Sequence, residues 1–535
     1  MAAHREQIAS AWSPLRAPLF RALWIAAVAS NVGTWMQNVS AAWLMTSLAP
    51  TPTMVALVQA ATSLPVVLVA LPAGAIADIV DRRGLLLVTQ GWMLAAAAGL
   101  GVLTLLDATT PWLLLTFTFA LGLGAAMNAP AWQAIIPELV SRSELRSAVT
   151  LNGAGYNVAR AVGPALGGLI VAASGPGAVF ILNALSFAGV IIVLYRWRRR
   201  VGESELPAED VLGAMRAGVR YVRYAPGLRA VLMRTAVFIL GGSALWALLP
   251  LVARQELGLD ATGYGLLLGC LGAGAVTGAA LLPRLQQKLS TEGSLTGGTV
   301  LFAIATATPA YIRNFALVAV AMILGGVAWI TVMSTFNAGA QLTVPGWVRA
   351  RALALYGLMF QGGTAFGSAL WGIVAEHVTL PLALFYAAAT LIIGLTAMLR
   401  YSLQLDQEIN LAPSPHWPAP RPLVPPPPDS GPVLVTVEYA IDPARARDFV
   451  AAMHGVESLR RRDGAYRWGL FNDPSIPNRY LETFLVESWA EHMRQHERVT
   501  MADKEVEDVA RAFHIGKAPP VVSHLIYASG EPPKR

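Results

Sequence analysis

The sequence contains little charge for its length. Only 13% of its 535 residues are Asp, Glu, Lys or Arg, whereas soluble domains average about 25%. Hydrophobic residues make up 55% of the chain, and the mean hydropathy is +0.53. A soluble chain of this composition would expose large apolar surfaces and aggregate. We therefore expect most of the chain to lie in a lipid bilayer.

Further absences narrow the class of protein. Cys270 is the only cysteine, so no disulfide can form within the chain. No Gly-x-x-x-x-Gly-Lys-Ser/Thr sequence occurs, which argues against a P-loop ATP motor. Charged residues such as Arg5 and Glu6 interrupt the N-terminal residues. The first long apolar stretch after them is long enough to cross a membrane. We therefore expect no cleavable signal peptide at the start of this sequence.

Long apolar stretches follow one another from Phe20 to Arg400. A helix needs about 20 apolar residues to cross the hydrocarbon core of a bilayer. Turn signals such as Ser174-Gly175-Pro176-Gly177 separate the stretches. We expect twelve transmembrane helices, at residues 20–46, 53–77, 84–106, 111–137, 148–173, 177–197, 230–252, 262–283, 296–312, 315–341, 350–375 and 380–399.

Basic residues gather in alternate connections between these stretches. Arg82 and Arg83 follow the second stretch and Arg196 ends the sixth, whereas the intervening connections hold almost none beyond Arg254 and Arg313. Arg and Lys in short loops stay on the cytoplasmic side of a membrane. We therefore expect both termini to be cytoplasmic in a multi-pass protein of the plasma (inner) membrane. The net charge of +7 is then an orientation signal, and we expect no nucleic-acid partner.

The two halves of the apolar region resemble each other. Gln133 and Pro137 correspond to Gln341 and Pro345, in both cases at an offset of 208 residues (341 − 133). A basic connection of about 30 residues divides six stretches from six, which indicates a parallel duplication. The expected boundaries are 1–200 for the N-terminal half, 201–229 for a cytoplasmic connection and 230–400 for the C-terminal half.

After residue 400 the composition changes to that of a soluble protein. Residues 411–432 are rich in proline, which is typical of an extended linker outside any packed unit. Hydrophobic periodicity then predicts the order β-α-β-β-α-β, with residues 489–514 forming a single second helix. This order predicts a ferredoxin-like α+β domain. The expected boundaries are 401–432 for the linker and 433–535 for the domain.

The turn between the second and third stretches reads GAIADIVDRRG. It resembles the signature loop of the major facilitator superfamily, with matches at Gly74, Asp78, Arg82 and Arg83 and departures at two positions between them. The resemblance implies that Gly74 lets helices approach closely. It also implies that Asp78 contacts a helix N-terminus of the other half, near Arg351, and so gates a transport cycle. The alternative is a solvated loop whose arginines only fix topology.

The fifth stretch contains the sequence Gly163-Pro164-Ala-Leu-Gly167-Gly168. It resembles the core of a motif found in exporters of the same superfamily, and it therefore favours export over uptake. Proline removes one backbone hydrogen bond and glycine permits tight helix packing, so we expect a rigid, kinked element that moves as one body. Small-residue packing alone, which any membrane bundle uses, is the alternative.

Arg160 is a charge deep inside a span. At 1.5 Å per residue it lies about 18 Å from the cytoplasmic end of its helix, near the bilayer midplane. Such a charge usually faces a cavity or a partner, so we expect it to bind an anionic or oxygen-rich substrate or to act as a counter-charge. The alternative is a structural pairing with backbone carbonyls. We expect polar and aromatic side chains of the first and eleventh stretches to line the same cavity: Asn31, Trp35, Gln37, Asn38 and Gln361.

His492 and His496 raise the question of a metal site, because residues four apart share one helical face. Beside Arg494 and Arg498 they are more typical of a solvated face. We therefore expect no metal ion and no cofactor.

The order of elements in the C-terminal segment is similar to the antibiotic-biosynthesis monooxygenase-like dimeric α/β barrel family. That likeness implies dimerisation through this domain, or alternatively an enzyme that acts on the transported molecule. Residues 15–400 resemble the enterobactin-exporter-like branch of the major facilitator superfamily. The resemblance implies a secondary active transporter, not an enzyme, that exports a siderophore or drug-like molecule by alternating access with proton coupling. The alternative is an uptake carrier for a small metabolite.

Overall fold

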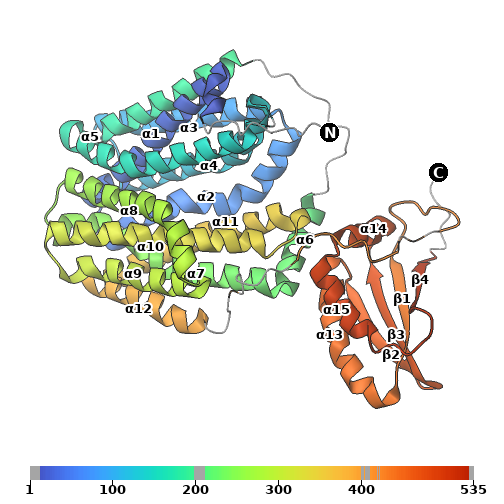
Figure 1. Cartoon of the computed structure of the whole chain (residues 1–535). Helices are drawn as coiled ribbons and strands as arrows, with labels where there is room; N and C mark the ends of the chain where they lie inside the picture. Colours follow the sequence, from blue (N-terminus) through green and yellow to red (C-terminus); the bar gives the residue numbers. More distant parts are fainter. Residues whose placement is uncertain are drawn as a thin grey trace, which may run out of the picture. The chain divides into compact units, whose positions relative to one another are not determined.

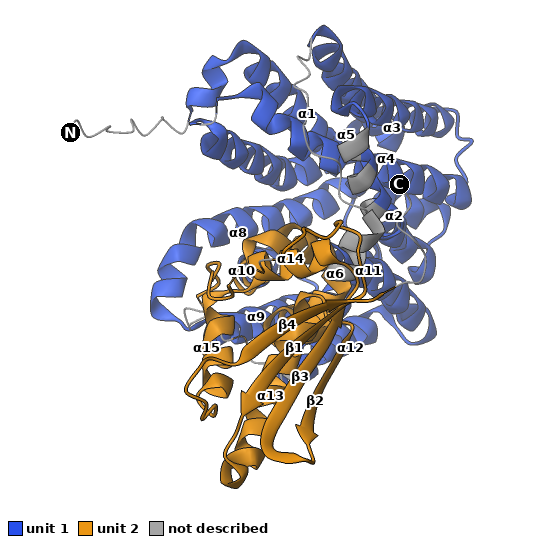
Figure 2. Cartoon of the chain, turned by 90° about the vertical axis from the view of Figure 1, so that its right-hand side faces the viewer, with its two compact units in different colours: residues 1–208, 232–337, 356–402 blue, residues 209–231, 338–355, 403–535 orange. Residues whose placement is uncertain are grey.

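The computed structural model describes residues 12–141, 143–197, 211–398, 403, 410–418, 420 and 422–528. The chain divides into two compact units, which Figure 2 shows in different colours. Unit 1 comprises residues 1–208, 232–337 and 356–402, and unit 2 comprises residues 209–231, 338–355 and 403–535.

Unit 1 is a bundle of long helices (Figure 1). Backbone φ and ψ stay helical through Pro164 and break at Gly175, inside the expected turn at 174–177, where a φ of 76° favours glycine. Counting α5 as two segments, the described helices confirm the twelve expected spans. With α5 counted as one, eight of the described helices are long and apolar enough to cross a membrane, judged by length and composition only. The helices that lie wholly or mostly in unit 1 are α1 (Pro18–Leu48), α2 (Pro52–Ile79), α3 (Arg82–Leu105), α4 (Pro111–Leu139), α5 (Leu145–Arg196), α7 (Pro226–Leu251, continued by η2, Val252–Glu256), α8 (Ala261–Lys288), α9 (Thr291–Tyr311), α10 (Phe315–Leu342), α11 (Arg349–His377) and α12 (Leu380–Met398).

Several helices begin at residues that satisfy their first free backbone N–H groups. The Asp81 carboxylate accepts a hydrogen bond from Gly84 N at 2.7 Å at the start of α3. Asp260 does the same for Gly263 N at 2.9 Å at the start of α8. Such a cap stabilises a helix by about 1 kcal/mol. The polar turn residues of the sequence therefore fix where these spans begin.

The helices of unit 1 form two halves, drawn from blue to teal and from green to orange in Figure 1. A buried core joins the halves at the end of the bundle that holds the α1–α2 turn, where Met45 and Val55 belong to one cluster with Leu248 and Leu251 of α7. At the opposite end a separate cluster, which includes Leu86, is built from the first half alone. We call these the α1–α2 end and the α2–α3 end.

Unit 2 contains a four-stranded antiparallel sheet in the order β2-β3-β1-β4. The described elements confirm the ferredoxin-like order, but the single helix expected at 489–514 is wrong. It is divided because Thr500 and Asp503 form a capping box that starts a new helix. The elements are α6 (Val211–Tyr224), η3 (Gly346–Val348), β1 (Val433–Ala440), α13 (Ala446–Asp463), β2 (Arg467–Asp473), β3 (Ile476–Val486), α14 (Trp489–Arg498), α15 (Met501–Arg511) and β4 (Val521–Ile526).

The proline-rich segment before this domain packs against it. Ser414 N donates a hydrogen bond to Val499 O at 2.9 Å. His416 and Trp417 both contact the buried carboxylate of Glu507, at 3.1 and 2.9 Å. The described residues of the segment are therefore part of unit 2. The expectation that they form a linker outside any packed unit is wrong, because two side chains within the proline-rich stretch satisfy a buried charge.

Candidate functional site

Arg160 lies on the side of α5 opposite three exposed apolar side chains. Val158, Val162 and Leu169 are 53%, 44% and 48% exposed, as expected of residues that face lipid. At about 100° per residue these three lie about 160–180° around the helix from Arg160. Arg160 is half-buried, and within the described ranges its guanidinium makes no hydrogen bond or ion pair; it interacts electrostatically with Tyr156. The charge therefore faces the interior of the bundle, and no residue that the structure describes fixes it by a hydrogen bond or ion pair.

The glycines around Arg160 let α5 approach helices of both halves. A Cβ atom added at Gly163 would lie 2.5 Å from Trp35 Cβ of α1, and one added at Gly168 would lie 2.5 Å from Ala261 O of α8. Gly167 also meets the α1 backbone. Distances this short leave no room for a side chain. The motif therefore packs α5 tightly between α1 of its own half and α8 of the other half.

Three of the candidates on α1 share one face. Asn31, Trp35 and Asn38 follow the i, i+4, i+7 spacing of a helical stripe. The Trp35 ring lies 6.3 Å from the ring of Tyr156, which is one turn from Arg160 on α5. The structure therefore brings this stripe beside the interior face that carries Arg160.

Gln37 lies on another face of α1 and is not a cavity residue. Asn183 of α5 donates a hydrogen bond to Gln37 Oε1, and both side chains are buried. Gly33 allows this approach, because a Cβ atom there would lie 2.5 Å from Asn183 Oδ1. Sequence analysis missed Asn183, although an asparagine inside a span was an available signal.

Gln361 lies on the side of α11 that faces away from the exposed apolar residues of that helix, as Arg160 does on α5. Met359, Phe366 and Ile373 are 43%, 65% and 48% exposed, and they lie about 120–160° around the helix from Gln361. Its neighbour Gly362 faces α2, with Val67 3.6 Å from the position of a Cβ atom. Gln361 therefore faces the interior from the second half, as Arg160 does from the first.

Arg82 and Arg83 join the start of α3 to two other helices of the first half. Arg82 Nη1 donates to Glu138 Oε1 of α4 at 3.0 Å. Arg83 Nε donates to Leu194 O at 2.8 Å, and its Nη2 donates to Tyr195 O at 2.9 Å, near the end of α5. These arginines satisfy helix-terminal carbonyls and a carboxylate. They therefore brace the α2–α3 end of the first half and do not only mark topology.

Gly74 and Asp78 lie in the last two turns of α2. Their side chains fall outside the described residues, so the expected contact of Asp78 near Arg351 stays a prediction.

Polar and aromatic contacts join the two halves at the α1–α2 end. The Arg254 guanidinium lies 5.6 Å from the ring of Trp43, which stacks on Tyr264 at 5.9 Å. Thr53 of α2 donates a hydrogen bond to Glu376 of α11. Together with the buried core there, these contacts close that end of the bundle.

Unit 2 joins the C-terminal domain to α6 and η3, two elements from the connections between the spans. Arg220 of α6 donates to Glu491 Oε1 of α14 at 3.1 Å, and Arg498 donates to the same oxygen at 2.6 Å. The Arg498 guanidinium lies 4.6 Å from the ring of Trp347 in η3, which contacts Tyr221 edge-on at 5.7 Å. Burial alone would raise the pKa of Glu491, but its hydrogen bonds and the charges of Arg498 and Arg220 lower it. Glu491 is thus the anion between two cations, one from each side of this contact.

Replacing Glu491 with alanine is expected to loosen α6 from the domain. Two arginines lose charge-assisted hydrogen bonds, each worth about 1.5–3 kcal/mol, so backbone amides of α6 should exchange with deuterium about 10-fold faster or more. Glu505→Ala is the matched control, since Glu505 is exposed on α15 and makes no ion pair among the described residues. Hydrogen exchange with mass spectrometry measures both variants. Equal exchange in the two variants would contradict the contact.

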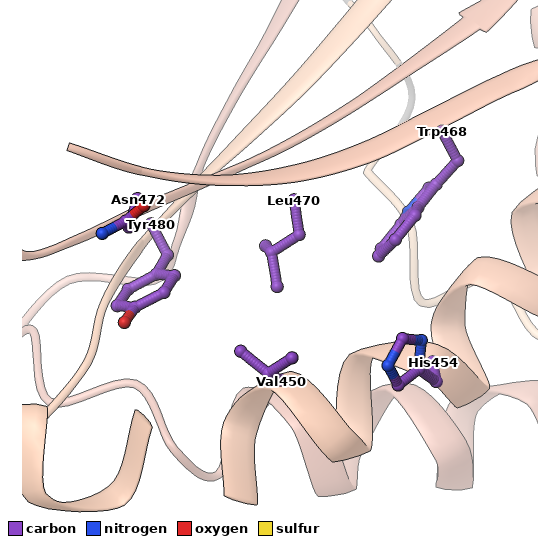
Figure 3. A pocket seen from close by; sticks show the side chains of 6 residues that line it. All are labelled: Val450, His454, Trp468, Leu470, Asn472 and Tyr480. Atoms are coloured by element: carbon purple, nitrogen blue, oxygen red, sulfur yellow. The ribbon is translucent and has the colours of Figure 1, made fainter. Parts of the chain in front are cut away.

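A pocket of about 360 Å³ lies between α13 and the sheet (Figure 3). Trp468, Leu470 and Tyr480 line it from the strands, and Val450 and His454 line it from α13, with Asn472 at one side. The His454 imidazole lies 3.6 Å from the Glu457 carboxylate. The lining therefore combines apolar and aromatic side chains with the polar groups of His454, Asn472 and Tyr480.

The outer face of the sheet carries exposed apolar side chains. Phe471 of β2 is 59% exposed, and Val521 and Leu525 of β4 are 62% and 55% exposed. Dimerisation through this domain stays a prediction. A second copy would pack against this face of the sheet.

The histidines of α14 do not lie on a solvated face. His492 is 1% exposed, and the ring of His496 lies 5.0 Å from it. The solvated-face interpretation is therefore wrong, because α14 turns this side toward the domain interior. His454, by contrast, has a side chain that is 69% exposed.

Comparisons with known proteins agree with this architecture. The sequence model of the family described as transmembrane secretion effector matches residues 9–531. The chain is 21% identical to a staphyloferrin A transporter of Staphylococcus aureus, over 64% of this chain and 86% of that protein. It is 24% identical to the multidrug efflux pump Tap of Mycolicibacterium fortuitum, over 75% of this chain and 99% of that protein. A bacterial homologue of the human lysosomal transporter Spinster, solved in an inward-facing state, aligns with a TM-score of 0.58 at 13% identity, covering 72% of this chain and 98% of that chain.

Proposed function

Because the chain belongs to the major facilitator superfamily, within the family described as transmembrane secretion effector, we propose that it exports a small molecule across the plasma (inner) membrane by alternating access. Membership makes it a multi-pass transporter with a small-molecule substrate in a lipid bilayer. Export, the substrate class and proton coupling are the proposed part. The glycine motif from Gly163 to Gly168 supports export.

The observation that carries the proposal is Arg160 on the interior face of α5, whose guanidinium has no hydrogen-bond or ion-pair partner among the described residues. A guanidinium at the membrane midplane costs at least about 2.5–3.5 kcal/mol unless water or a partner solvates it. A substrate with carboxylate, phenolate or carbonyl oxygens would supply that partner during transport. Asn31, Trp35, Asn38 and Gln361 add amide and indole groups to the same interior. We therefore propose an oxygen-rich, anionic siderophore or drug-like compound as the substrate.

We propose that the structure represents the state open to the cytoplasm. Basic residues lie mainly in the connections of the α2–α3 end, which supports placing that end and both termini inside the cell. The described contacts between halves close the opposite, α1–α2 end. Conversion to the outward state would separate those contacts and bring the α2–α3 ends together, where Gly74, Asp78, Arg82 and Arg83 lie. We propose that these residues gate the cycle and that Gly163, Pro164, Gly167 and Gly168 keep α5 rigid through it.

The direct test uses inverted membrane vesicles, in which an exporter takes up its substrate. Vesicles that contain the full chain are expected to accumulate a siderophore or drug from a panel when a proton gradient, acidic inside, is imposed. A protonophore should abolish the accumulation, and vesicles without the protein are the control. Accumulation only in right-side-out vesicles would establish an uptake carrier. Chemical conversion of the compound during transport would establish an enzyme function for the C-terminal domain.

A further inference from the structure

Three imidazoles of the C-terminal domain converge on one point. His492 and His496 lie one turn apart on α14, and His524 lies on β4. One ring nitrogen of each lies within 4.8 Å of the others. The Nε2 atoms of His492 and His496 are 3.4 Å apart. Two facing N–H groups would repel at this distance, so at least one of the two nitrogens presents a lone pair.

The fold brings these residues together from different elements. Residues four apart on a helix lie on one face, which aligns His492 with His496. His524 stands opposite Val435 in the β1–β4 ladder, and the buried Val435 side chain belongs to the core beneath the helices. His524 therefore points to the same face of the sheet, and its ring centre lies 4.8 Å from that of His492.

Hydrogen bonds orient the two helical rings. His492 Nδ1 lies 3.2 Å from Oε1 of the fully buried Gln495, so Nδ1 carries the proton and Nε2 presents its lone pair. His496 makes a hydrogen bond with the backbone of Trp417. Metal-binding histidines use their second nitrogen in this way, with a protein acceptor fixing the tautomer. The hydrogen bond at His492 Nδ1 leaves the His492 Nε2 lone pair free, and the Nε2 atom of His496 faces it.

The surroundings favour neutral imidazoles, the form that binds metal ions. Burial first, and the nearby histidines and Arg460 second, lower the pKa of His492 and that of His496 to about 4 each, although one hydrogen bond at each ring acts in the opposite direction. Burial also lowers the pKa of His524. The nearby Arg460 would repel a cation, but its charge is balanced by Glu482 at 3.0 Å and Glu507 at 2.6 Å.

We propose that His492, His496 and His524 bind a divalent transition-metal ion, preferentially Zn²⁺, with water as the fourth ligand. A tetrahedral Zn²⁺ site with Zn–N bonds of about 2.0–2.1 Å places its ligand nitrogens about 3.4 Å apart, which is the spacing of His492 and His496. A rotation of the His524 side chain brings in the third ligand. Imidazole ligands suit Zn²⁺, Cu²⁺ and Ni²⁺, whereas Mg²⁺ and Ca²⁺ prefer oxygen.

The same helix makes the contacts with α6 and η3. Glu491, next to His492, holds Arg220, and Arg498 lies against Trp347. A bound ion would link α14 to β4 and so make α14 more rigid. Because α14 contacts α6 and η3, which belong to connections between the membrane spans, these two elements would be held more firmly as well. The metal site therefore also provides a route by which a metal ion could act on the carrier.

The test titrates Zn²⁺ alone into the full, tag-free chain in detergent after removal of metal with a chelator. We expect one Zn²⁺ per chain with a dissociation constant on the order of 1 μM or tighter. Co²⁺ bound at the same site should give the intense visible absorption of tetrahedral coordination. Zn²⁺ should also slow hydrogen exchange at α14 and α6.

Variants of the two less buried ligands locate the site. His496→Ala and His524→Ala are each expected to weaken Zn²⁺ binding by about 100-fold or more and to abolish the Co²⁺ absorption. His454→Ala, which removes an exposed histidine of the same domain, should leave both unchanged. Unchanged affinity in both ligand variants, or absence of binding by the wild-type chain, would overturn the site. Binding that leaves exchange at α6 unchanged would overturn only the link to the carrier.

Discussion

Replacing Arg160 with alanine is expected to lower transport by about 100-fold or more while the protein still folds and inserts. Removing one member of a desolvated charge pair costs about 2–5 kcal/mol. Here the variant removes the arginine and leaves the charge of the substrate without its partner. Folding is spared because, among the described residues, no hydrogen bond or ion pair depends on the Arg160 side chain. Substrate flux into inverted vesicles measures the first effect, and thermal unfolding of the purified protein measures the second.

Two further variants sharpen this test. Arg160→Lys keeps the charge but loses the planar, bidentate donor, so we expect partial transport of a carboxylate-bearing substrate. Arg146→Ala removes an exposed arginine from the same helix and should transport normally. Full transport by Arg160→Ala would contradict the proposed role. A failure of that variant to fold would instead support the structural alternative, in which the guanidinium serves backbone carbonyls.

The twelve spans could be predicted from the sequence because their signals are local. Hydropathy over about 20 residues marks a span, and the polar residue at its start, such as Asp81 or Asp260, also caps the helix in the structure. The turn at Gly175 was likewise readable, since its positive φ requires a residue without a Cβ atom.

The interior site could be predicted only in part. The depth of Arg160 follows from counting residues, but the direction of its side chain needed the exposed positions of Val158 and Val162. Its position in the sequence groups Gln37 with its neighbours on α1, but the structure gives it a partner on α5. That partner, Asn183, lies 146 residues away in the sequence, and contacts of this separation leave no local pattern.

The C-terminal domain shows the same limit more strongly. Proline content predicted an extended linker here and gave no sign that His416 and Trp417 would both reach the buried Glu507. His524 lies in a strand that gave no sign of a ligand. It joins His492 only through the pairing of β4 with β1, which sequence spacing alone does not reveal.

The second large effect is expected from the smallest possible side-chain addition, Gly168→Ala. Its Cβ atom would lie 2.5 Å from Ala261 O and 3.0 Å from Gly265 Cα, both backbone atoms of α8. Neither can yield like a flexible side chain, so α5 and α8 must separate. We expect transport to fall about 10-fold or more and the unfolding temperature to drop by several degrees, since overpacking costs about 1–3 kcal/mol.

The matched control for this variant is Gly153→Ala on the same helix, where the added Cβ atom has no neighbour within 4 Å. Alanine favours a helix over glycine by about 1 kcal/mol at either position. The control should therefore be as stable as the wild type or slightly more so, and any loss at Gly168 reflects the α5–α8 contact alone. If both variants transport and unfold alike, the two halves do not pack through Gly168. The glycine motif would then serve its own half of the carrier.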